Sequence, residues 1–233
     1  MRLTVREAAV HLGVDEATAR RWIAQRGLPA HQAQERAYIN PVELWEWAVE
    51  QGIPVSRRLI DQDRESPDDM PPLADLLRAG GIFHDIPGRA KADVLREFVE
   101  RLPLPPEQDR TFLLSVLEAR EAMGSTGIGD GIAIPHVRNA IVLHVERPFV
   151  TLGLLAHPID FGAMDGKPVH ALFMVVSPTV PAHLKVLSRL AFVLRDDDVR
   201  GLLAKRAAAD AILERIAYVE TTKTTGGFPA ARP

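Results

Sequence analysis

Residues 124–136 form a glycine-rich stretch that reads GSTGIGDGIAIPH. Its four glycines permit backbone conformations that other residues resist, and they bring amides close to a ligand or a neighbouring segment. The apolar run 132–134 predicts a short strand that delivers Pro135 and His136 at its end. No Lys-Ser or Lys-Thr pair follows the glycines, and their spacing differs from the dinucleotide fingerprint, so the stretch gives no support to nucleotide binding.

His136 is the residue of this stretch that can carry covalent chemistry. An imidazole with an ordinary pKa of about 6.5 is largely neutral near pH 7, and it can take up a phosphoryl group and later release it. The reaction needs an acceptor for the other ring nitrogen and donors around the phosphoryl oxygens, which Pro135 and the glycine loop can help to arrange. We interpret six other histidines as surface or core residues: His11, His31, His84, His144, His157 and His170.

Helices and strands are expected to alternate around this stretch. Apolar periodicity predicts helices over 73–78, 90–102 and 105–123, the last opened by Pro105 and Pro106. Strands are predicted over 82–86 and 132–134, and the longest apolar run, 171–176, suits a buried strand. The alternation indicates an α/β (α+β) domain.

Residues 121–136 resemble the signature of enzyme IIA of the fructose and mannitol class, which includes a nitrogen-regulatory branch. The signature has an acidic or amide residue, a spacer of six, an apolar-Gly pair, two residues and then apolar-Ala-apolar-Pro-His. Glu121, the pair Ile128-Gly129 and residues 132–136 fill it. The blocks 159–169 and 177–191 agree with the same family. The resemblance implies a type-2 enzyme IIA domain over residues 73–220, with a mixed sheet flanked by helices.

The resemblance also implies the roles of three residues. His136 is the phosphorylated nucleophile, His183 is the second active-site histidine, and Arg120 neutralises charge on the phosphoryl group. An imidazole near a helix start would also add a donor to amides already disposed toward anions. Val137 departs from the family pattern, in which a small residue often follows the active histidine. No cofactor or metal is implied.

Residues 1–53 predict a small helix-turn-helix domain. Thr4 and Glu7 have the spacing of a capping box, Gly13 ends the first helix, and Asp15 can cap a second helix over 16–25. With a short wing and the helix of NPVELWEWA, the segment resembles an excisionase-like or MerR-like winged helix-turn-helix. The candidate DNA contacts are Thr18, Arg20, Arg21 and Arg36.

An alternative interpretation treats these arginines as an ordinary solvated helix face. Asp15 and Glu16 place negative charge where a recognition helix would begin, which disfavours DNA. Trp22 and Trp45 are expected to be core aromatics.

The rest of the chain sets the domain organisation and the environment. Residues 54–72, rich in acidic residues and proline, are expected to form a linker, and residues 221–233 a disordered tail. The absence of cysteine is compatible with a reducing compartment, and the start lacks an export signal. No apolar run is long enough for a membrane helix. We therefore expect a cytoplasmic protein without membrane insertion and with net charge −3.

Three functions remain open from the sequence. The first is a regulator that takes phosphate on His136 from HPr or a nitrogen-branch phosphocarrier and controls transcription through residues 1–53. The second is a sugar-uptake carrier that passes phosphate to a separate enzyme IIB. Either would be a component of a phosphotransferase system without a small-molecule substrate of its own, acting on enzyme IIB or on regulated target proteins. The third is a metal hydrolase, although no HExxH pattern occurs. A homodimer would suit DNA half-sites.

Overall fold

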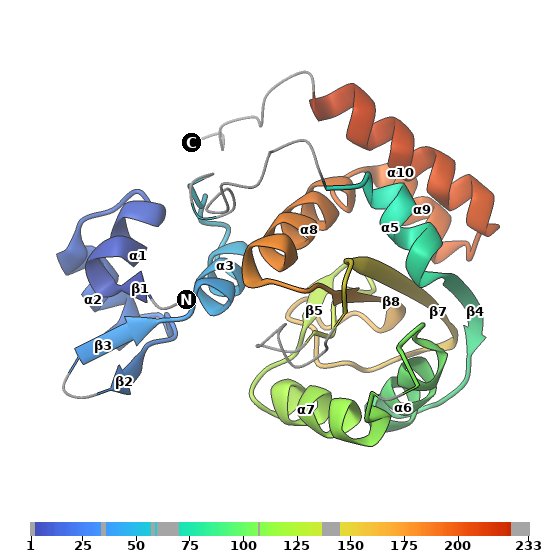
Figure 1. Ribbon diagram of the computed structural model, residues 1–233, viewed down its shortest axis with the longest axis horizontal. Coiled ribbons are helices and arrows are strands. Elements are labelled where there is room, and N and C mark those ends of the chain that lie inside the picture. The colour runs from blue at the N-terminus through green and yellow to red at the C-terminus, as the bar shows by residue number, and fades with distance from the viewer. Residues whose placement is uncertain are drawn as a thin grey trace. The chain divides into compact units, whose positions relative to one another are not determined.

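The computed structural model describes residues 3–33, 36–56, 59, 70–106, 108–136 and 145–224. These residues form two compact units, one ending at Leu59 and one beginning at Met70 (Figure 1). Most of the expected linker 54–72 lies outside the described residues.

The described residues of the amino-terminal unit form helices and a small antiparallel sheet of order β1-β3-β2. Its elements are β1 (Leu3–Thr4), α1 (Val5–His11), α2 (Glu16–Gln25), β2 (His31–Ala33), β3 (Arg36–Ile39) and α3 (Pro41–Glu50). Side-chain caps begin α1, α2 and α3, as the sequence predicts. Thr4 and Glu7 form a capping box, Asp15 accepts from the backbone N–H of Thr18, and Asn40 caps α3. The strand β1 was not predicted.

Apolar contacts hold the helix-turn-helix together. Val5, Ala9 and Ala19 are buried where α1 meets α2. Trp45 and Trp47 of α3 are also buried, and the Trp47 indole N–H donates to the carbonyl of Arg26 at 2.9 Å. Trp22 is half-buried, and its ring packs against Trp47 with centroids 5.4 Å apart. The expected aromatic core is therefore present.

The carboxy-terminal unit is built on a five-stranded mixed sheet of order β4-β7-β8-β6-β5. The strands are β4 (Ile82–Ile86), β5 (Gly127–Gly129), β6 (Ile132–Ala133), β7 (Phe149–Ile159) and β8 (Val169–Val176). Strands β4 and β7 are parallel, as are β6 and β8, whereas β7–β8 and β5–β6 are antiparallel. This confirms the expected mixed sheet.

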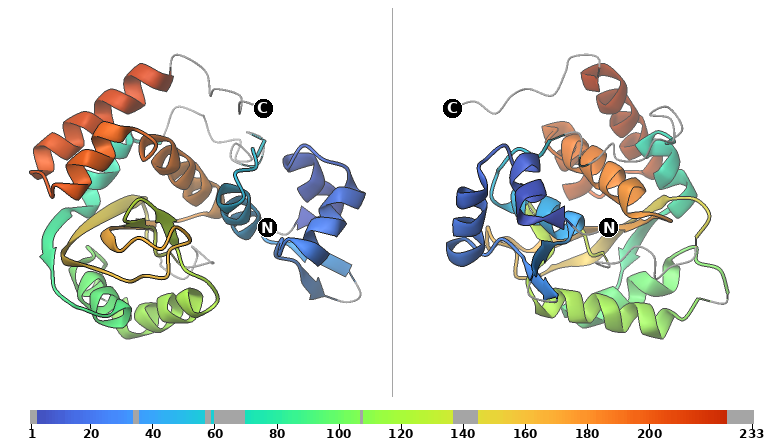
Figure 2. Two further views of the ribbon diagram at one scale, coloured as in Figure 1. Left: turned by 180° about the vertical axis from the view of Figure 1, so that it is seen from behind. Right: turned by 60° about the vertical axis from the view of Figure 1, so that its left-hand side comes forward.

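Helices cover both faces of this sheet. Figures 1 and 2 show α6 (Lys91–Arg101) and α7 (Arg110–Ala122) on one side. On the other side lie α5 (Leu73–Gly80), α8 (Val180–Val193), α9 (Asp197–Ala204) and α10 (Ala209–Thr224). The alternation of elements in the sequence thus produces a three-layer arrangement.

Two element boundaries differ from the prediction by four residues or more. Helix α7 begins at Arg110 rather than at Pro105 or Pro106, because the Asp109 side chain accepts from the N–H of Phe112 and caps it there. Helix α10 reaches Thr224, four residues into the segment expected to be a tail. The remainder of that segment, from residue 225, lies outside the described part of the chain.

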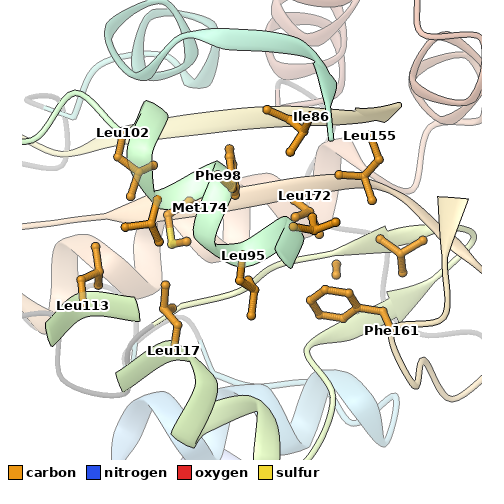
Figure 3. Close-up of a cluster of buried hydrophobic side chains, with 14 of the residues drawn as sticks. Ile86, Leu95, Phe98, Leu102, Leu113, Leu117, Leu155, Phe161, Leu172 and Met174 are labelled. Carbon is orange, nitrogen blue, oxygen red and sulfur yellow. The ribbon is translucent and has the colours of Figure 1, made fainter. Parts of the chain in front are cut away.

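The main core lies between the sheet and helices α6 and α7. Figure 3 shows Leu95 and Phe98 of α6 among side chains of the sheet and of α7, namely Ile86, Leu113, Leu117, Leu155, Leu172 and Met174. Leu172, Met174 and Val176 alternate along β8 and all belong to this core. The opposite face of β8 is therefore turned toward the layer that contains α8.

We expect Phe98→Ala to lower the free energy of unfolding by about 3–5 kcal/mol, because it removes a fully buried ring and leaves a cavity. Urea denaturation measures this value. Phe112→Ala is the matched control, since 52% of Phe112 is exposed and its loss should change stability by no more than about 0.5 kcal/mol. Equal losses for the two variants would contradict this account of the core.

Candidate functional site

The sheet topology brings His136 and His183 to the same edge. Strands β6 and β8 are parallel neighbours, so the segments that leave their carboxyl ends emerge together. His136 follows β6 by three residues, and His183 is the fourth residue of α8, the helix that follows β8. The ring centroids are 5.7 Å apart with an interplanar angle of 47°, and both residues are at most 4% exposed. The structure thus pairs the two predicted histidines.

A backbone hydrogen bond fixes the orientation of the His136 ring. Nδ1 of His136 lies 2.6 Å from the carbonyl oxygen of Ile134. A carbonyl oxygen only accepts, so Nδ1 carries the proton and, in the neutral ring, the lone pair is on Nε2. This arrangement provides the acceptor that a nucleophilic histidine requires.

Ile134 is in turn held by a series of hydrogen bonds that reaches α7 and α6. The N–H of Ile134 donates to the carbonyl of Thr126 at 3.0 Å. Both the N–H and the hydroxyl of Thr126 donate to the buried carboxylate of Glu121, which also pairs with Lys91 Nζ at 3.0 Å. A buried carboxylate with three donors is well compensated. Glu121, the first residue of the sequence signature, therefore supports the strand that carries His136.

Sequence reasoning identified Glu121 but missed Thr126 and Lys91 as its partners. Thr126 falls in the variable spacer of the signature, and Lys91 is 30 residues from Glu121, so no local pattern marks either residue.

Arg120 lies in the last turn of α7 and is buried. Its Nη1 donates to the carbonyl of Gly124 at 2.8 Å, which fixes the start of the glycine loop. Arg120 therefore lies at the start of the glycine loop, next to Glu121, and the two histidines form a direct ring contact.

Asp130 occupies the opposite end of β6, in the tight turn after β5, with a positive φ of 51°. Its carboxylate pairs with Lys167 Nζ at 2.7 Å and with Arg200 Nη1 at 3.3 Å. The hydrogen bond from Lys167 lowers the pKa of the Asp130 carboxyl. These contacts assign Asp130 to the turn rather than to the histidine pair.

The candidate DNA contacts differ in their surroundings. Arg20 is exposed but donates through Nε and Nη2 to Glu16, one turn earlier, at 3.1 and 2.6 Å. Arg21 is exposed on the same helix, and Thr18 is half-buried with its N–H donating to Asp15. Arg36 lies in β3, and its side chain is outside the described part of the structure. Arg21 is therefore the more available of the two helix arginines.

Two further properties of the described residues concern metals and membranes. In that part of the chain, no three His, Asp or Glu side chains gather as a set of metal ligands. None of the described helices combines the length and apolar character needed to span a bilayer.

Comparisons with known proteins match both units. Residues 75–219 match the family model "Phosphoenolpyruvate-dependent sugar phosphotransferase system, EIIA 2", and residues 2–52 match the model "Helix-turn-helix domain". A nitrogen regulatory protein of Pseudomonas aeruginosa is 34% identical over 151 residues, which cover 64% of this chain and 96% of that protein. A fructose-specific EIIA component of Haloferax volcanii is 37% identical over 113 residues, 48% of this chain and 71% of that protein.

A solved structure is also similar. The nitrogen regulatory protein IIA-Ntr of Neisseria meningitidis aligns with a TM-score of 0.54 and 30% identity, over 61% of this chain and 97% of that one.

We expect neutral His136 to be predominantly the Nδ1–H tautomer, because the carbonyl of Ile134 accepts from Nδ1. Nitrogen-15 chemical shifts of the ring, measured above the imidazole pKa, distinguish a protonated nitrogen from a bare one. Exposed His157 is the control and should show the tautomer mixture of a solvated imidazole. A predominant Nε2–H form of His136 would overturn the assignment of the lone pair to Nε2.

Proposed function

This chain belongs to the phosphoenolpyruvate-dependent sugar phosphotransferase system EIIA 2 family, and we propose that it is a regulator that accepts a phosphoryl group on His136. The observation that carries the proposal is the buried pair His136–His183, with Nδ1 of His136 bound to a carbonyl. The phosphate donor is an HPr-type or nitrogen-branch phosphocarrier, and the reaction takes place in the cytoplasm. No cofactor is required.

The Nδ1–H tautomer of His136 determines how the phosphoryl group is transferred. Nε2 of His136 attacks the phosphorus of the donor's phosphohistidine, so an N–P bond forms at Nε2 while the donor's N–P bond breaks. The electron pair of the broken bond stays on the donor imidazole. His136 keeps its Nδ1 proton and becomes cationic, and the carbonyl of Ile134 stabilises that charge. No proton has to move during the step.

His183 and Arg120 assist this step in the proposal. His183 lies in the first turns of α8, where a ring N–H can donate to a phosphoryl oxygen near the positive end of the helix dipole. Burial of both histidines excludes water and strengthens such interactions. Arg120 contributes positive charge from the adjacent end of α7.

The helix-turn-helix domain favours regulation over sugar uptake. Its match at residues 2–52 supports DNA binding, and relatives named nitrogen regulatory proteins cover the other domain. The phosphoryl group carries about −1.5 to −2 charges at pH 7, of which the cationic ring offsets about one, and the added negative charge would change a docking surface for regulated targets. A homodimer would match paired half-sites in DNA.

The alternative is a carrier that passes phosphate to a separate enzyme IIB. The fructose-specific relative supports it, because that protein is a component of a sugar system by name. The alternative leaves the helix-turn-helix domain without a role.

We expect His136→Ala to abolish labelling by phosphoenolpyruvate in the presence of enzyme I and HPr, because the only proposed nucleophile is removed. The label should be acid-labile and alkali-stable, and it is measured by gel autoradiography. His157→Ala, which changes an exposed histidine on β7, should be labelled like the wild type. Label that persists in the His136 variant would refute the assignment.

We expect Arg21→Ala to weaken binding of selected genomic DNA by the full chain by about 1–3 kcal/mol, as for loss of a base or phosphate contact. Arg20→Ala should cost less, because Glu16 already occupies its guanidinium. Fluorescence anisotropy at several salt concentrations measures both effects. Arg78→Ala, an exposed arginine of α5, is the control. Equal affinities of the Arg21 variant and the wild type would exclude Arg21 as a DNA contact.

A further inference from the structure

Ser177 directly follows β8 and is 1% exposed. Within the described part of the chain, its hydroxyl is buried without a hydrogen-bond partner. A buried hydroxyl that has lost its water and gained no partner costs free energy, so such groups are rare and need an explanation. The neighbouring hydroxyl of Thr179 is in a different state, because it accepts from the N–H of Ala182 and caps α8.

The strand register places Ser177 on the side of the sheet that carries the histidine pair. Leu172, Met174 and Val176 face the core under α6 and α7, so alternation turns residues 173, 175 and 177 to the α8 side. Ala133 belongs to the same core under α6 and α7. By the same alternation, residues 134 and 136 face the opposite side, which carries α8.

The distance along the strands is also short. Ala133 is level with Leu172 in the parallel pair β6–β8. Continuing this register three residues past the end of β6 brings His136 level with about residue 175, diagonally from Ser177. Helix α8, which contains His183, begins three residues after Ser177. Ser177 therefore lies between the two segments that bring the histidines together.

We propose that the Ser177 hydroxyl donates a hydrogen bond to the phosphoryl group on His136, an inference that rests on the proposed function. A phosphoryl oxygen is a strong acceptor, and an O–H donor in a dry site binds it well. In the unphosphorylated protein the hydroxyl has no partner among the described residues, and on phosphorylation it gains one. The new hydrogen bond removes the cost of burying the Ser177 hydroxyl and therefore stabilises the phosphorylated state relative to the unphosphorylated one.

This role predicts that stability and activity respond in opposite directions. Ser177→Ala removes an unsatisfied group, so the urea midpoint of the unphosphorylated chain should stay the same or rise. The rate of phosphorylation by phosphoenolpyruvate, enzyme I and HPr should fall about tenfold to a hundredfold, as for loss of one donor to a developing charge.

Thr151→Val is the matched control. The Thr151 hydroxyl is equally buried, but it already has a partner, because from β7, on the side of β8 away from β6, it donates to the carbonyl of Gly80 at 2.9 Å. This variant should lower the urea midpoint and leave the phosphorylation rate of the folded protein unchanged.

The outcomes separate this inference from the proposed function. If wild-type protein takes no label on His136, the proposed function fails. If wild type is labelled on His136 and Ser177→Ala is labelled at the same rate, the proposed function stands and the role of Ser177 is overturned. Ser177→Cys keeps the side-chain volume and weakens the donor, so it provides the same test without a cavity, and a wild-type rate in that variant also overturns the role.

Discussion

The pairing of β6 with β8 is the constraint on which the site depends. Strand β6 has only two residues, yet it is bonded to β8 on one side and to β5 on the other. Because β6 and β8 are parallel, the chain leaves both at the same edge, and His136 meets the helix that carries His183. An antiparallel pair would send the two segments to opposite ends of the sheet. The sheet topology thus determines the chemistry that two distant segments can perform together.

The buried carboxylate of Glu121 stabilises the position of β6 and of the residues that follow it. The Glu121 carboxylate accepts hydrogen bonds from Thr126 and Lys91, and the backbone carbonyl of Thr126 accepts from the N–H of Ile134. Removing any one partner would leave a charge or a polar group unsatisfied in a dry environment, which proteins tolerate poorly. The hydrogen bond from His136 to Ile134 therefore rests on contacts that extend across two helices, and the protein itself fixes the orientation of the ring.

Periodicity and local capping predicted the alternation of helices and strands and the capped starts of α1, α2 and α3, whereas the mixed sheet was implied by the family resemblance. The prediction failed where two local signals competed. Proline tolerates the first turn of a helix, but a capping side chain places the start, so α7 begins after Asp109 rather than at Pro105. The contacts of Lys91 and the unsatisfied hydroxyl of Ser177 depend on packing between segments far apart in the chain. No spacing rule in one sequence encodes them.

Helix α8 joins the site to the place where the chain enters the carboxy-terminal unit. Arg189 Nη1 donates to the carbonyls of Met70 and Pro71, and Glu220 accepts from the N–H of Leu73. His183 and Arg189 are six residues apart, so about 9 Å of helix separates them. A helical segment this short, less than two turns, moves as a rigid unit. Helix α8 thus contacts His136 through His183 and binds residues 70 and 71 through Arg189. A displacement of this helix would therefore also shift the point where the chain enters the unit.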